Sequence, residues 1–250
     1  MNPIIIIPLL LILGFLIGLI VNYLSDVLPA NRRLSKPVCL NCLSVRDWVD
    51  FITFKTCKNC GRKVSFRAII IPFVFMILTT FLYFSPLQRL GFWPNLLLFT
   101  YFIIVLINDL EYRIVLFQVS ITGLLICAVF GYFLHGLVST ILGGLAGFLM
   151  MYLLYLGGGW FTKFLSKRRG EPIDQVALGF GDVAISTVIG LLLGWPAITA
   201  GLLIGIIAGG LISGLFLLGM LILRKYQPLT ALPYTPFLVL GALILLFTKG

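Results

Sequence analysis

Long runs of apolar residues, separated by short polar connections, dominate this sequence. The eight longest runs span about residues 3–24, 68–85, 95–109, 118–134, 137–160, 182–195, 197–223 and 232–248. Most are close to the ~20 residues that an α-helix needs to cross a bilayer. They do not alternate apolar and polar residues as the strands of a membrane β-barrel do. The pattern therefore predicts an all-α polytopic membrane protein with about eight transmembrane helices.

The composition supports the same class of protein. Of the 250 residues, 60% are hydrophobic and 10% are charged, whereas about a quarter of a soluble domain is charged. Residues 1–24 lack the basic start and the small-residue cleavage site of a secretory signal, so we interpret them as a retained first transmembrane helix. We expect residues 25–67 to form a cytoplasmic loop and residues 68–250 to form the main helical bundle.

The distribution of Lys and Arg predicts the topology. Nine lie in the 25–67 loop, one in 110–117, four in 161–181 and two in 224–231. The alternate connections and the end of the chain hold only Arg89 and Lys249, so the count is sixteen against two. Because basic loops stay on the cytoplasmic side, we expect both termini to lie outside. The net charge of +10 is then explained without a nucleic-acid partner.

Four cysteines in the 25–67 loop form two Cys-x2-Cys pairs, Cys39 with Cys42 and Cys57 with Cys60. This spacing is typical of a tetrahedral zinc site, and each pair occupies a tight turn. Two disulfides are the alternative, but the cytoplasm is reducing. The sequence therefore predicts a small zinc-ribbon-like loop with structural Zn²⁺, with iron as the alternative metal.

Two aspartates lie at ends of the shortest apolar runs, Asp109 at the end of the third and Asp182 at the start of the sixth. The topology places both at the cytoplasmic membrane face. Carboxylates there are costly and mark functional sites. Three interpretations are open: helix-end residues with Asp182 as an N-cap, a cation or proton site of a transporter, or an aspartyl catalytic pair. Gly179 and Gly181 before Asp182 favour close approach of a substrate backbone.

The order of these features resembles the bacterial type IV prepilin peptidase family, membrane aspartyl proteases of the Gly-x-Gly-Asp type. Four pieces match in order: Asn22 and the paired cysteines; Asp109-Leu110-Glu111-Tyr112-Arg113-Ile114; Leu178-Gly179-Phe180-Gly181-Asp182-Val183; and Pro233-Tyr234-Thr235-Pro236-Phe237. The resemblance covers nearly the whole chain.

The resemblance implies that Asp109 and Asp182 are the catalytic pair and that Gly179, Phe180 and Gly181 form a loop approached by the substrate. It implies cleavage of a basic leader, after a glycine, from prepilin or pseudopilin precursors at the cytoplasmic face of the inner membrane. Many members then methylate the new N-terminus with S-adenosylmethionine. No glycine-rich nucleotide loop is present in the sequence, so this second activity depends on the resemblance alone.

Recognition of a basic leader requires acidic side chains. The Lys167-Arg168-Arg169 run is a poor match for such a leader and is typical of a cytoplasmic anchor at anionic lipid. Glu111, Glu171 and Asp174 are the candidates. Glu111 has two alternatives, a pair with Arg113 or exposure to water.

Overall fold

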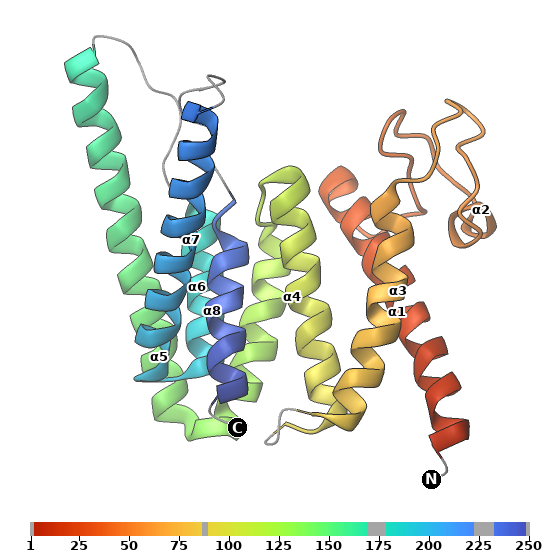
Figure 1. Ribbon diagram of the computed structural model, residues 1–250, viewed down its shortest axis with the longest axis horizontal. Coiled ribbons are helices and arrows are strands. Elements are labelled where there is room, and N and C mark those ends of the chain that lie inside the picture. The colour runs from red at the N-terminus through yellow and green to blue at the C-terminus, as the bar shows by residue number, and fades with distance from the viewer. Residues whose placement is uncertain (1–2, 87–89, 170–178, 223–232, 249–250) are drawn as a thin grey trace. The chain divides into compact units, whose positions relative to one another are not determined.

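The computed structural model describes residues 3–86, 90–169, 179–222 and 233–248. Within these ranges the chain forms helices and no strand, with one isolated bridge between Val38 and Val45. The helices are α1 (Pro3–Asn31), α2 (Trp48–Ile52), α3 (Phe66–Phe84), α4 (Phe92–Tyr112), α5 (Phe117–Arg169), α6 (Phe180–Leu193), α7 (Ala197–Ile222) and α8 (Thr235–Thr248), shown in Figure 1. The predicted all-α class is confirmed.

The predicted apolar runs correspond to seven of these helices. The fourth and fifth runs are the two parts of α5, which bends at Gly136, where φ is 80° and ψ is 169°. By length and composition, five of the described helices can cross a membrane, namely α1, α3, α4, α5 and α7, while α6 and α8 are shorter apolar helices. The additional helix α2 has five residues and lies in the cysteine loop.

Two predicted helix ends are wrong. The helix α1 continues to Asn31, beyond the predicted end at residue 24. Its polar residues Asn22, Ser25 and Asp26 are buried, and their spacing of three and four places them on one helix face. The helix α4 has 21 residues, so the predicted short third segment is wrong as well. Asp109 therefore lies in the last turn of a full-length helix rather than at its end.

The chain divides into two compact units, Met1–Tyr112 and Arg113–Gly250. In the first unit α1, α3 and α4 pack together around Val21, Phe75, Ile104 and Ile107. Gly18 of α1 lies against the backbone of Pro72 in α3, where a Cβ atom would have no room. Small residues allow such close packing of membrane helices.

In the second unit the most extensive helix contact joins α5 to α6. Gly143 of α5 and Gly190 of α6 bring their backbones into direct contact, and the Ser186 hydroxyl donates to the carbonyl of Gly147 at 3.2 Å. The glycines of this part of α5 thus serve helix packing. They hold α6 firmly against α5, and the first turn of α6 carries Asp182.

Candidate active site and metal site

The four cysteines of the loop come together in one cluster. The Sγ atoms of Cys39, Cys42, Cys57 and Cys60 all lie within 4.8 Å of one another. The Sγ–Sγ distance is 3.7 Å for Cys39 and Cys60 and 3.8 Å for Cys42 and Cys57. A tetrahedral zinc with Zn–S bonds of about 2.3 Å requires Sγ–Sγ distances of about 3.8 Å. The four thiols are free rather than disulfide-bonded, so the donor set fits a tetrahedral metal ion.

Backbone hydrogen bonds shape the two turns in the same way. The amide of Cys39 donates to the carbonyl of Ser44 at 2.9 Å, and the amide of Cys57 donates to the carbonyl of Arg62 at 3.0 Å. In each turn the carbonyl of the first cysteine also accepts a bond, from Leu43 at 2.8 Å or from Gly61 at 2.9 Å. The repeated pattern is that of paired zinc turns.

The electrostatics of the loop favour thiolate at Cys57. Hydrogen bonds from the backbone amide of Cys60 and then from the Ser44 hydroxyl lower the pKa of Cys57 to about 6. Salt bridges brace the loop beside it: Lys58 Nζ lies 2.6 Å from Asp50 Oδ2, and this hydrogen bond lowers the pKa of Asp50. A loop of this size has little apolar core, so such polar contacts and a metal ion would stabilise it.

Asp182 occupies the first turn of α6, where a backbone amide and a hydroxyl donate hydrogen bonds to its carboxylate. The N-cap of α6 is Gly179, so Asp182 stands at the third helical position and its interpretation as the N-cap is wrong. The Gly179 amide donates to Asp182 Oδ2 at 3.2 Å, and the Thr235 hydroxyl at the start of α8 donates to Oδ1 at 3.1 Å. Asp182 is 9% exposed. Both carboxylate oxygens are therefore oriented, and the helix dipole favours negative charge at this end.

The glycines before Asp182 have distinct structural requirements. A Cβ atom on Gly181 would lie 2.6 Å from Val115 Cγ2, so only glycine fits there without movement. Phe180 is exposed and makes an edge-on contact with Tyr155, with ring centroids 6.1 Å apart. The carboxylate of Asp182 and the exposed ring of Phe180 thus lie two residues apart in the first turn of α6.

Asp109 lies in the last turn of α4 and is 7% exposed. Its neighbour Asn108 is also buried. Glu111, two residues later, forms an ion pair with Arg67 of α3, with Nη1 and Oε2 2.8 Å apart. Glu111 thus pairs with Arg67 rather than with Arg113, and its side chain is still 34% exposed. Glu171 and Asp174 lie outside the described residues.

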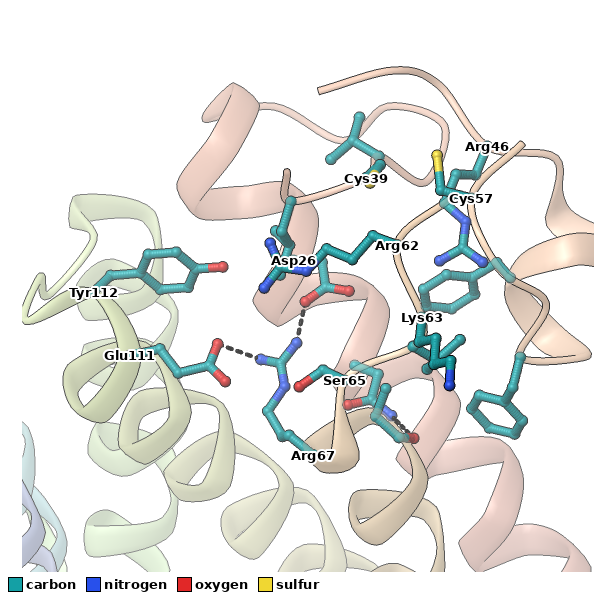
Figure 2. A pocket seen from close by; sticks show the side chains of 17 residues that line it. Asp26, Cys39, Arg46, Cys57, Arg62, Lys63, Ser65, Arg67, Glu111 and Tyr112 are labelled. Atoms are coloured by element: carbon teal, nitrogen blue, oxygen red, sulfur yellow. Dashed lines mark hydrogen bonds and ion pairs between the residues drawn. The ribbon is translucent and has the colours of Figure 1, made fainter. Parts of the chain in front are cut away.

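A cavity of about 310 Å³ opens above this ion pair in the first unit (Figure 2). The cysteine loop, the end of α1, the start of α3 and the end of α4 supply its walls. Arg67 reaches between Asp26 and Glu111, and it forms an ion pair with each of them. The cavity therefore joins the metal-binding loop to the helix that carries Asp109.

Comparison with known proteins shows a similarity over part of this chain. Residues 96–214 match the type IV leader peptidase family, and both aspartates fall inside the match. Over these residues the chain is similar to the type IV leader peptidases. This finding confirms the resemblance that the sequence motifs indicated.

Several relatives are each named "Prepilin leader peptidase/N-methyltransferase". The protein of Aeromonas salmonicida is 25% identical over 76% of this chain, that of Myxococcus xanthus is 25% identical over 84%, and that of Aeromonas hydrophila is 24% identical over 88%. The chain spans 61% and 62% of the length of the first two relatives and 74% of the third. No solved structure matches the chain.

Two side chains that contact the candidate site residues, Thr235 and Arg67, were not predicted from the sequence. Thr235 was noted only as part of a proline-flanked motif, although its hydroxyl between two prolines in an apolar stretch is an unusual placement. Arg67 was counted only as one of many loop cations. The sequence feature that could have indicated its role is its position directly before an apolar run. A membrane helix that begins there would bury the Arg67 side chain against other polar side chains.

Proposed function

We propose that this chain is an aspartyl endopeptidase that removes the basic leader from type IV prepilins or pseudopilins, after a glycine, at the cytoplasmic face of the inner membrane. Asp109 and Asp182 are the catalytic pair of this proposal. The observation that carries it is that both carboxylates, 7% and 9% exposed, stand at helix ends inside the matched residues 96–214. Buried carboxylates in membrane helices are costly and are retained for function.

In this mechanism one aspartate is protonated and polarises the scissile carbonyl, while the other is ionised and takes a proton from water. Two carboxylates close together cannot both ionise readily, so they share one proton. The hydrogen bonds from Gly179 and Thr235 hold the Asp182 carboxylate in one orientation. Such preorganisation lowers the cost of reaching the transition state.

The placement in the membrane follows from charge. The basic loops would lie in the cytoplasm and both termini outside, and the last turn of α4 and the first turn of α6 would then lie at the cytoplasmic face. Exposed leucines and isoleucines along α5 and α7 would face lipid. Glu111, Glu171 and Asp174 are the proposed contacts for the basic leader.

The four-cysteine cluster would hold a structural Zn²⁺, because four thiolates leave no open position for chemistry. A second activity, N-methylation of the new N-terminus with S-adenosylmethionine, is proposed from the names of the relatives. A purified prepilin incubated in detergent with and without S-adenosylmethionine tests both activities by mass spectrometry of the product.

The deciding experiment replaces each catalytic carboxylate. We expect Asp109→Asn and Asp182→Asn to abolish cleavage of a purified prepilin while the protein still inserts and folds. Asp47→Asn, in an exposed side chain of the loop, is the matched control and should cleave normally. Wild-type cleavage by either catalytic variant would contradict the assignment. Ion-dependent flux into liposomes without proteolysis would instead support a transporter.

A further inference from the structure

One side chain connects three helices of the first unit at the level of the last turn of α4. Arg67, in the first turn of α3, forms ion pairs with Asp26 of α1 and Glu111 of α4 (Figure 2). The side chains of Arg67 and Asp26 are 14% and 11% exposed, and that of Glu111 is 34% exposed. The pair with Asp26 is therefore largely shielded from water and is screened little by salt, whereas the pair with Glu111 is more exposed.

The ion pair between Arg67 and Glu111 matters for the proposed function because Asp109 lies on the same turn of α4 as Glu111. On the membrane side, Ile104 and Ile107 fix α4 in the apolar core shared with α1 and α3. On the other side, Glu111 makes the ion pair, and α4 ends one residue later at Tyr112. Asp109 thus lies between an apolar anchor and an ionic anchor. Without the second anchor, the last turn of α4 would lose an ionic contact that ties it to α3, and helix ends fray readily.

The chemistry of arginine suits this task. Its planar guanidinium presents donors on separate nitrogens, and here Nη2 bonds Asp26 while Nη1 bonds Glu111. A lysine ammonium is a single point charge on a flexible stem and does not reproduce that fork. Loss of Arg67 would also leave two acidic side chains close together without their shared cation.

We propose that Arg67, acting through Glu111, is a positioning residue that holds Asp109 in its catalytic place. This inference rests on the proposed function, since it takes Asp109 as catalytic. It assigns Glu111 a role that differs from leader recognition, and the two roles predict different kinetics. A positioning contact affects the chemical step and lowers kcat, whereas a leader contact affects binding and raises KM.

The test measures kcat and KM for cleavage of a purified prepilin by the metal-loaded 250-residue chain in detergent. We expect Arg67→Met and Glu111→Gln each to lower kcat by about 10²-fold with little change in KM, since a displacement of about 1 Å can cost that much. The double variant should lose no more than either single variant. Arg67→Lys should recover only part of the loss, because it restores charge but not the fork.

Arg62→Met is the matched control. Arg62 lines the same cavity but bonds Asn41 within the loop, so its loss should leave kcat within a few-fold of wild type. Metal content and melting temperature are measured for every variant. Where Arg67→Met folds poorly, Arg67→Lys and Glu111→Gln carry the test.

Two outcomes overturn the inference. In the first outcome, Glu111→Gln raises KM and leaves kcat unchanged, while Arg67→Met lowers KM. This would mean that Glu111 binds the basic leader, because removing the Arg67 cation would free Glu111 for that contact. The other outcome is an unchanged kcat in both Arg67 variants, or an equal loss in Arg62→Met. Absence of prepilin cleavage by the wild-type protein would instead refute the proposed function, so the two failures are distinguishable.

Discussion

The hydrogen bond from Thr235 to Asp182 gives the sharpest prediction for the proposed active site. Thr235→Val removes the hydroxyl and keeps the shape of the side chain, so the Oδ1 atom of Asp182 loses its donor at 3.1 Å. A buried hydrogen bond to a charged group contributes about 1.5–3 kcal/mol. At ~1.4 kcal/mol per tenfold in rate, this range corresponds to a loss of about 10-fold to 150-fold.

The structure favours the lower end of that range. The distance of 3.1 Å is longer than the usual O–H···O distance of about 2.7–2.8 Å. The Gly179 amide also continues to hold the other carboxylate oxygen, at 3.2 Å. We therefore expect kcat for prepilin cleavage to fall about tenfold, while KM changes little because the hydroxyl is fully buried and does not meet the leader.

The assay is steady-state cleavage of a purified prepilin in detergent, with product followed by gel or mass spectrometry. Thr235→Ser keeps the donor and should restore most of the rate. Thr80→Val is the matched control, since its hydroxyl bonds only the carbonyl of Met76 in its own helix. A wild-type kcat in Thr235→Val, or an equal loss in the serine variant, would refute the idea that this hydroxyl orients Asp182.

Three further predictions concern packing and metal. Gly181→Ala should lower activity and destabilise the protein by about 1–3 kcal/mol, because its Cβ would lie 2.6 Å from Val115 Cγ2; Val115→Ala in the same chain should restore both, and a fully active single variant would contradict the steric argument. Cys39→Ser should abolish zinc retention and lower the melting temperature, as read by metal analysis and thermal unfolding; metal-free wild-type protein would contradict the site. Zinc binding at pH 7 should release protons, detectable by calorimetry in buffers of different ionisation enthalpy. Since the pKa of Cys57 is about 6 and the pKa of Cys60 is raised, Cys57 is already thiolate at that pH while Cys60 gives up a proton. Acidification below the pKa of Cys57 should then weaken binding further, and a pH-independent affinity would contradict thiolate ligation.

Much of this fold could be predicted because membrane helices are long and their apolar runs are easily read. The eight runs correspond to helices, the break between the fourth and fifth runs corresponds to the bend of α5 at Gly136, and the four-cysteine spacing corresponds to a cluster of four thiols. The ends of the helices were harder to predict from the sequence. A run of apolar residues stops at the first charged residue, but the helix continues when polar residues such as Asp26 or Glu111 find buried partners.

The candidate site shows the same limit. The motif around Asp182 could be recognised in the sequence because glycines and a carboxylate in an apolar chain are conspicuous. The donor from Thr235 was not, since it depends on how the start of α8 packs against α6. Arg67 could not be singled out from the sequence either. The loop holds many cations, and tertiary contacts with Asp26 and Glu111 decide which of them lies on the membrane side of the loop.

The shortness of α6 and α8 has a consequence for the lipid around them. Each has 14 residues and so is about 21 Å long, while the hydrocarbon layer is about 30 Å thick. Both begin at the hydrogen bond between Asp182 and Thr235. If their far ends meet one surface, the carboxylate lies about 9 Å below the other. Bilayer thickness then sets how much water reaches Asp182. Proteolysis in vesicles should accordingly be faster in short-chain lipids, where hydrophobic mismatch is smaller.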